Sequence, residues 1–326
     1  MFRHFCRALL PASLLMGVGQ PALGHSDMTE PAPSTVGRSL SHAFDPGTAG
    51  FTVTARGELD INYRVFTLFA QPGETIPLSS SRELRWAMPT GETVTGRSLR
   101  WTAPETPGLQ TAIITTGDGQ IMELNILVMH EAANGRVGDY RLGEYPGQAY
   151  RGNPVYNAPT HFAEVPENLR NLRISPHFTL GQFLCKQETE GNPYLIVSER
   201  LLAKLEIILA AVNAHGWRTD TFFVMSGYRT PAYNAAIGNG RYSRHIYGGA
   251  ADIFIDTDGD GRMDDLNSDG LVTREDAAAL YDVIESMWED DEFGDLVGGL
   301  GEYGPNTVRG PFVHVDERGW RARWGR

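Results

Sequence analysis

Three side chains that lie far apart in the chain constrain its fold most strongly. His245 and Asp252 close the stretch Ser226–Asp252, SGYRTPAYNAAIGNGRYSRHIYGGAAD, and His314 lies downstream in GPFVHVD. A catalytic zinc ion is typically held by three imidazole or carboxylate ligands, with a fourth position left for water. We therefore predict that these three residues bind zinc, which requires a fold that brings the distant segments together.

The segments around these residues have the pattern of strands and tight turns. TFFVMS (221–226) has the composition of a buried strand, and GYRTP then turns the chain so that Arg229 projects into a cleft. Gly248 and Gly249 are predicted to let the backbone pass close to the metal, and AADIFID is predicted to be the strand that carries Asp252.

A family resemblance follows from these motifs. SGYRTPAYN, SRHIYGGAADI and GGLGEYG…FVHVD resemble the zinc D-Ala-D-Ala-type peptidases, which share a fold with the Hedgehog signalling domain. Within that group the chain is most similar to the periplasmic murein endopeptidase branch, and the resemblance covers residues 174–326. It implies that His245, Asp252 and His314 bind zinc. It also implies that Arg229 contacts substrate and that the substrate is the peptide part of peptidoglycan.

The chain departs from that family at the general base. Many members carry an acidic or histidine base three residues before the last zinc ligand, where this chain has Pro311. Residues two apart on a strand share a face, so Asp316 is expected to face the metal beside His314, and we predict it as the base. Glu302 in GLGEYG is the alternative, and Asp316 could instead orient a histidine.

An acidic insertion, residues 256–276, has the spacing of an EF-hand-like calcium loop. Positions one, three, five, seven, nine and twelve are Asp265, Asn267, Asp269, Leu271, Thr273 and Asp276, with Gly270 at position six. A second, overlapping set contains Asp256, Asp258, Asp260 and Asp264. We predict one calcium ion in the first set, and a second ion if both sets are used. The ion is expected to order the zinc site, and the alternative is a solvated acidic loop.

Together these residues predict a zinc peptidase of the murein endopeptidase or DD-/LD-carboxypeptidase type. Zinc would activate water for attack on a peptide carbonyl, while Arg229 would bind the developing oxyanion or a substrate carboxylate. Ser243 and Tyr303 are predicted substrate contacts, although a turn or packing role fits each equally well. Two alternatives stay open. One is a non-catalytic zinc- and calcium-containing peptidoglycan-binding module, which Pro311 favours. The other is a calcium-dependent adhesion protein that binds through residues 45–130.

The N-terminus predicts export to the periplasm. Residues 1–24 contain two arginines, then an apolar stretch too short to span a bilayer, and end in an A-x-A-like site, which is typical of a removed signal peptide. Removal of those two positive charges takes the formal net charge from −12 to −14. An acidic exported protein is a poor candidate for nucleic-acid binding. Cys6 leaves with the signal, so Cys185 is expected to be a lone, buried thiol.

Composition divides the remaining chain into four parts. Residues 25–45 are predicted to be a mobile leader, and residues 46–130 a small β-sandwich of about seven strands. Residues 131–173 form a Gly/Tyr/Pro-rich connector that is either a flexible linker or packs along the next domain. Residues 174–326 are predicted to be the Hedgehog/DD-peptidase-like zinc domain. Its helix is predicted to be capped by Ser198, to end at Gly216 and to cover a small sheet, so the fold class is α+β.

Overall fold

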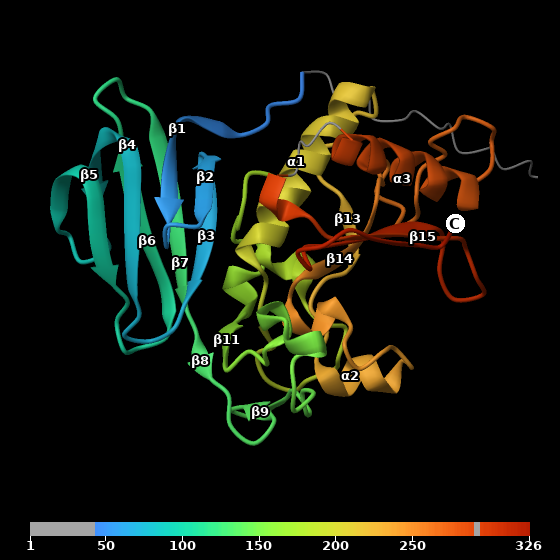
Figure 1. Ribbon diagram of the computed structural model, residues 1–326, viewed down its shortest axis with the longest axis horizontal. Coiled ribbons are helices and arrows are strands. Elements are labelled where there is room, and N and C mark those ends of the chain that lie inside the picture. Colours follow the sequence, from blue (N-terminus) through green and yellow to red (C-terminus); the bar gives the residue numbers. More distant parts are fainter. Residues whose placement is uncertain (1–42, 290–293) are drawn as a thin grey trace, which may run out of the picture. The chain divides into compact units, whose positions relative to one another are not determined.

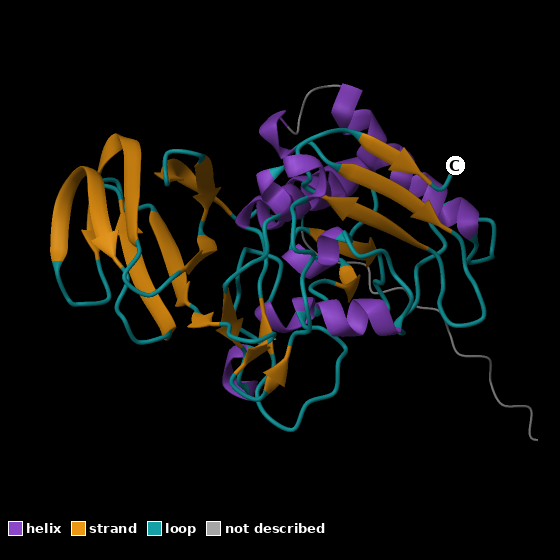
Figure 2. Cartoon of the chain, turned by 60° about the horizontal axis from the view of Figure 1, so that its bottom comes forward, coloured by secondary structure: helices purple, strands orange, loops and turns teal. Residues whose placement is uncertain are grey.

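The computed structural model describes residues 43–289 and 294–326 of the chain (Figure 1). The predicted signal peptide and most of the predicted leader therefore lie outside the described residues. Within the described part, no helix is long and apolar enough to cross a membrane. Strands make up the N-terminal sheet, whereas the helices belong to the chain that follows it (Figure 2).

The N-terminal sheet contains seven strands, which agrees with the number predicted. They are β1 (Thr48–Ala55), β2 (Leu59–Tyr63), β3 (Val65–Ala70), β4 (Thr75–Ala87), β5 (Thr93–Thr102), β6 (Gly108–Thr115) and β7 (Ile121–Val128). Hydrogen bonds join them in the order β2-β1-β4-β6-β7-β3, with β5 paired to β4. All pairs are antiparallel except β3 with β7.

The long strand β4 explains why hydrogen bonding joins all seven strands, where a sandwich predicts two separate sheets. Its first half pairs with β1 at Leu78 and Ser79, and its second half pairs with β6 from Arg85 to Ala87. A register shift between Ser79 and Leu84 separates the two halves, and such irregularities bend a strand. Strand β4 thereby connects two groups of strands that would otherwise be distinct layers.

The predicted connector packs against the following chain. It contains the short strands and 3₁₀ helices β9 (Arg136–Val137), β10 (Tyr140–Arg141), η1 (Tyr150–Gly152), η2 (Pro154–Tyr156), β11 (His161–Glu164) and η3 (Glu167–Leu169). Strand β11 also joins β8 (His130–Glu131) and β12 (Tyr194–Leu195) in a three-stranded sheet. The hydroxyl of Tyr145 donates to the carbonyl oxygen of Ile246 at 2.8 Å, and Tyr156 is buried. The packed form of the connector is therefore the one observed.

The C-terminal part, residues 174–326, combines helices with a five-stranded sheet, in agreement with the α+β prediction. Its elements are η4 (Leu180–Phe183), α1 (Glu199–His215), β13 (Phe223–Ser226), α2 (Pro231–Ala236), η5 (Arg244–Tyr247), β14 (Ala250–Phe254), α3 (Arg274–Glu289), η6 (Gly294–Leu296), β15 (Gly299–Tyr303), β16 (Phe312–Asp316) and β17 (Ala322–Trp324). The strand order is β13-β14-β16-β15-β17, in which only β15 and β17 run parallel.

Two local predictions for this part need correction. Helix α1 begins after Ser198 and ends at Gly216 in the left-handed conformation (φ 112°), but the Ser198 side chain makes no capping hydrogen bond. Strand β13 begins at Phe223, which is exposed, so it is not the buried strand predicted. The reason is its position, because β13 forms one edge of the sheet.

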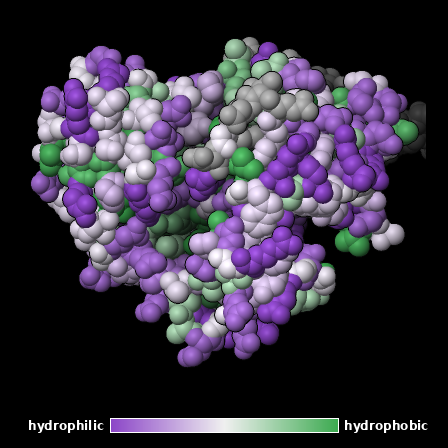
Figure 3. All heavy atoms as spheres, viewed as in Figure 1, coloured by the Kyte–Doolittle hydropathy of each residue, from purple (hydrophilic) through white to green (hydrophobic). Residues whose placement is uncertain are grey.

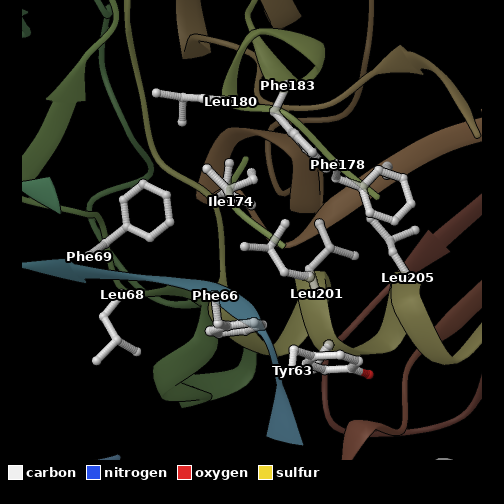
Figure 4. Close-up of a cluster of buried hydrophobic side chains, with 14 of the residues drawn as sticks. Tyr63, Phe66, Leu68, Phe69, Ile174, Phe178, Leu180, Phe183, Leu201 and Leu205 are labelled. Atoms are coloured by element: carbon white, nitrogen blue, oxygen red, sulfur yellow. The ribbon is translucent and has the colours of Figure 1, made fainter. Parts of the chain in front are cut away.

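One hydrophobic core runs from the N-terminal sheet into the C-terminal part. Phe66 and Leu68 of β3 belong to the same cluster of buried side chains as Phe178, Leu201 and Leu205 (Figure 4). Hydrophilic residues cover most of the face of the molecule shown in Figure 3. The N-terminal sheet and the C-terminal part accordingly form one compact unit, and the domain boundaries drawn from composition stay a prediction.

Candidate metal centre

Strand pairing and one 3₁₀ helix bring the three predicted zinc ligands together. Asp252 on β14 lies directly opposite His314 on β16, so their side chains share one face of the sheet. Helix η5 supplies His245 from a segment that precedes β14. All three side chains are buried.

The ligand atoms form a compact triangle. The Nε2 atom of His245 lies 3.2 Å from Oδ1 of Asp252 and 3.2 Å from Nδ1 of His314, and that Nδ1 lies 2.8 Å from the same oxygen. A tetrahedral zinc ion with bonds of about 2.0–2.1 Å separates its ligand atoms by about 3.3 Å. The spacing of the three atoms therefore fits zinc.

The outer hydrogen bonds of the two histidines fix which nitrogen faces inward. Nδ1 of His245 lies 2.7 Å from the carbonyl oxygen of Gly227, and Nε2 of His314 lies 3.1 Å from Oδ2 of Asp316. Both partners are acceptors, so each outer nitrogen carries the proton of a neutral ring. The inner nitrogens and Asp252 then direct three lone pairs at one point, an arrangement that a cation stabilises.

The charges of the cluster are consistent with this donor set. Burial lowers the pKa of His245, while hydrogen bonds with Asp252 and Asp316 overcome burial and raise the pKa of His314. Burial opposes ionisation of Asp252, but the two histidines hold its pKa well below the usual range. Asp252 therefore keeps its negative charge inside the protein.

Arg229 contacts the second oxygen of the same carboxylate. Its Nη2 donates to Oδ2 of Asp252, and its Nε donates to Oγ of Ser226 at 2.7 Å. The predicted role of Arg229 was substrate binding, and the structure does place it in the wall of the cavity beside the ligands. Its guanidinium, however, holds Asp252 so that Oδ1 points at the histidines.

Residues 176–266 match the sequence model of a family described as Peptidase M15. The match includes His245 and Asp252 and ends before His314. It supports the resemblance to the M15 zinc D-Ala-D-Ala peptidases and, with the His-Asp-His cluster, zinc-dependent peptidase activity. No protein in the set of curated sequences matches the chain.

The three ligands lie in the wall of a cavity of about 620 Å³. Ser243 and Tyr303, the predicted substrate contacts, also line it, and both are half-buried. Trp324 closes part of the wall, with its ring 5.1 Å from that of His314 and its Nε1 donating to the Tyr303 hydroxyl at 2.8 Å. Sequence reasoning missed Trp324 because the C-terminal segment matches no spacing motif.

The structure places Asp316 differently from the prediction. It shares a strand face with His314, but its Oδ2 lies at Nε2, the nitrogen that points away from Asp252 and His245. Its carboxylate also accepts from Arg318 Nε at 2.9 Å and from the backbone amide of Gly299 at 2.7 Å. Burial opposes its ionisation, yet His314 and Arg318 hold the pKa of Asp316 well below the usual range. Such a carboxylate is suited to orienting His314 and poorly suited to accepting a proton.

Glu302, the alternative base, faces away from the cavity. It lies opposite Val313 in the sheet, whereas the neighbouring Gly301 lies opposite His314, so Glu302 and His314 are on different faces. Its carboxylate pairs with Arg274 at 2.5 Å and with Arg326 at 2.9 Å. These ion pairs give Glu302 a structural role at the start of α3.

The glycines after His245 are needed for reasons other than the metal. Gly248 has a φ of 67°, and a Cβ atom there would collide with the carbonyl oxygen of Ile196. A Cβ atom at Gly249 would collide with the ion pair between Arg244 and Glu317. The prediction was that these glycines let the backbone approach the metal. The structure shows that they let it approach Ile196 and the ion pair between Arg244 and Glu317.

The acidic insertion brings three carboxylates together in the second of the two predicted calcium sets. Oxygens of Asp256, Asp258 and Asp260 lie within 4.8 Å of one another, and the Asp256 side chain accepts from the amide of Gly261 at 3.0 Å. The turn at Asp265 has the same form, because its carboxylate accepts from the amides of Asp269 at 3.2 Å and Gly270 at 2.7 Å, but Asn267 supplies an amide oxygen there in place of the middle carboxylate. Asp264 is used locally, because its carboxylate accepts from the hydroxyl of Thr257 at 2.7 Å.

The position-twelve residue of the favoured set also has another function. Asp276 is fully buried, and its carboxylate accepts from the backbone amides of Leu266 at 2.8 Å, Asn267 at 3.3 Å and Thr273 at 2.7 Å. Asp276 therefore ties the loop to the first turn of α3 through these hydrogen bonds.

Proposed function

We propose that the protein is an exported zinc peptidase that hydrolyses peptide bonds in the stem peptides or crosslinks of peptidoglycan. The observation that carries this proposal is the convergence of three lone pairs, from His245, Asp252 and His314, in the wall of an open cavity. The match to Peptidase M15 supports the same reaction class. Membership of the murein endopeptidase branch and a periplasmic location are parts of the proposal.

Each polar residue of the site has a separate task in this proposal. Gly227 and Asp316 fix the ring orientation of the two histidines, and Arg229 holds Asp252 from its other oxygen. Bound zinc would supply Lewis acidity, which polarises a peptide carbonyl and lowers the pKa of water. Ser243 and Tyr303, which line the cavity, would contact the peptide.

Muropeptide analysis tests this function. The zinc-loaded protein without residues 1–24 is incubated with purified peptidoglycan, alongside the variants His245→Ala and His215→Ala. His215 is an exposed histidine at the end of α1, so its replacement is the matched control. New muropeptides are expected from the parent and from His215→Ala, and none from His245→Ala.

A second function is favoured by one observation. Among the described residues that line the cavity, Asp252 is the only one with a carboxylate side chain, so the wall offers no separate acidic base. A non-catalytic peptidoglycan-binding module would have this property. It predicts that the zinc-loaded protein sediments with peptidoglycan and releases no products, the opposite of the result expected above.

For the acidic insertion we propose a calcium ion bound by Asp256, Asp258 and Asp260. The support is the gathering of their oxygens within 4.8 Å and the position of Asp256, two residues after the end of β14. Calcium bound by these three carboxylates would stabilise the strand that carries Asp252. Addition of calcium to the chelated protein should raise the melting temperature, and Asp258→Asn should abolish the rise. An unchanged melting temperature in the parent protein would exclude the site.

A further inference from the structure

Arg309 is a positively charged residue in the wall of the cavity. The proposed reaction assigns it no role. It lies on the loop between β15 and β16 and lines the same cavity as the ligands. Its guanidinium carbon lies 4.3 Å from the centre of the Phe312 ring and 5.3 Å from that of Tyr303. These two rings are stacked with centroids 4.6 Å apart. The amino group Nη1 donates to the carbonyl oxygen of Gly304 at 3.1 Å. Arg309 is therefore held in place by aromatic and backbone groups.

The other arginines near the ligands are already neutralised by acids. Arg229 pairs with Asp252, Arg318 with Asp316, and Arg244 with Glu317. Within the described residues, Arg309 forms no ion pair with a carboxylate. Its charge is consequently available to a ligand in the cavity.

The Arg309 side chain is partly shielded from water. It is also close enough to Asp252 for the charge of that carboxylate to affect it. Burial lowers the pKa of Arg309, and the charge of Asp252 acts in the opposite direction. A guanidinium remains charged under such a shift and presents a planar fork of donors that matches a carboxylate. In a partly desolvated cavity, such a pair is stronger than it is in water.

We propose that Arg309 binds a carboxylate that the peptide substrate carries next to the bond that is cut, and so selects acidic peptides. This inference rests on the proposed peptidase function and deepens it. It assigns carboxylate recognition to the β15–β16 loop and leaves Arg229 to hold Asp252. A peptide whose carboxylate is converted to an amide loses the charge-assisted hydrogen bonds that Arg309 offers.

Diacetyl-L-lysyl-D-alanyl-D-alanine and its C-terminal amide test the proposal, because they differ only in the one carboxylate. With zinc-loaded protein, the free acid is expected to have a kcat/KM about 10- to 100-fold above that of the amide. Arg309→Met should bring this ratio close to one, mainly by raising KM for the acid, and Arg309→Lys should restore part of it. Arg97→Met, at an exposed arginine of β5, is the matched control and should keep the parental ratio.

Calorimetric binding of the same two peptides to the metal-free protein separates this proposal from the peptidase function. Tighter binding of the acid by the parent, with the preference lost in Arg309→Met, supports the role of Arg309 even if neither peptide is hydrolysed. Equal affinities for the two peptides, no binding of either, or an unchanged preference in Arg309→Met would overturn the proposal.

Discussion

At the residue scale, one hydrogen bond decides which nitrogen of His314 faces the other two ligands. The backbone amides of Gly299 and Arg318 donate to Oδ1 of Asp316, whereas the Arg318 guanidinium contacts both oxygens, so the two fixed amides would keep the oxygen of an asparagine on the Oδ1 side. Its amide nitrogen would then face Nε2 of His314 and donate to it, which moves the ring proton to Nδ1. The lone pair aimed at the metal would be lost.

Asp316→Asn should therefore weaken zinc binding by about 10- to 100-fold, the usual effect of removing such a partner. Competition with a zinc chelator measures the affinity, and circular dichroism checks that the fold persists. Glu302→Gln is the matched control, since this carboxylate lies on the opposite face of the sheet and should leave zinc affinity unchanged. Full zinc affinity with loss of turnover in Asp316→Asn would instead restore Asp316 as the base.

The same residue shows how far sequence reasoning reached into the site. Residue type and the family resemblance were sufficient to predict that His245, Asp252 and His314 converge, because the motifs SRHIYGGAADI and FVHVD together supply three ligands of the kinds that zinc prefers. Strand period also placed Asp316 beside His314 correctly. It could not show which edge of the imidazole Asp316 contacts, because that depends on the side-chain rotamer and on Arg318.

At the scale of elements, helix α1 places an ionisable side chain, that of Lys204, in the interior of the protein. Lys204 is fully buried, its Nζ donates to the backbone oxygen of Asp316 at 2.8 Å, and it lies 4.6 Å from the centre of the Trp288 ring of α3. Burial lowers the pKa of Lys204 from 10.5 to about 7. Between these two pH values the unfolded chain binds a proton that the folded chain does not.

Stability should consequently rise as the pH increases from about 7 to 10.5, because the unfolded state releases its extra proton over this range. Lys204 contributes a slope of up to about 1.4 kcal/mol per pH unit, and Lys204→Met should remove it. Urea unfolding at several pH values measures the difference between variant and parent. Lys186→Met, at an exposed lysine, should keep the parental slope. Parallel curves for parent and Lys204→Met would contradict the prediction.

The start of α3 depends on the buried carboxylate of Asp276. Asp276→Ala would leave the backbone amides of Leu266, Asn267 and Thr273 without their acceptor, so we expect a loss of about 2–4 kcal/mol in the free energy of unfolding. The loss should be equal in calcium and in chelator. A loss that appears only in calcium would make Asp276 a ligand, as the EF-hand spacing first indicated. The neighbouring exposed Glu275→Ala is the control.

At the scale of the whole molecule, the sequence predicted the individual strands and helices better than the packing of the N-terminal sheet against the C-terminal part. Alternating residues gave the strand number of the N-terminal sheet, and the helix pattern gave α1. The continuous core was not predicted, because it depends on which faces meet. Phe66 and Phe178 lie more than a hundred residues apart in the chain, and no local pattern pairs them. The composition changes that mark the predicted domain boundaries therefore do not reveal that the two parts share one core.

A continuous core predicts that the N-terminal sheet and the C-terminal part unfold together. Phe66 is fully buried in the cluster that also contains Leu201, and Phe→Ala changes at such sites cost about 3–5 kcal/mol. A polar link adds to this coupling, since Arg56 after β1 donates to the carboxylate of Glu199 in α1 at 2.9 Å. Phe66→Ala should then lower the temperature of one common transition.

Scanning calorimetry of the zinc-loaded protein tests this coupling, with loss of bound zinc followed by a metal-sensitive dye during the same heating. Because the three ligands lie in the C-terminal part, zinc should be released at the temperature where the heat is absorbed, both in the parent and in Phe66→Ala. Ile121→Ala, at an exposed position of β7, should leave that temperature nearly unchanged. If Phe66→Ala instead splits the heat absorption, with zinc released only in an unshifted second peak, the sheet unfolds separately. The buried contacts of β3 would then do no more than join two independent domains.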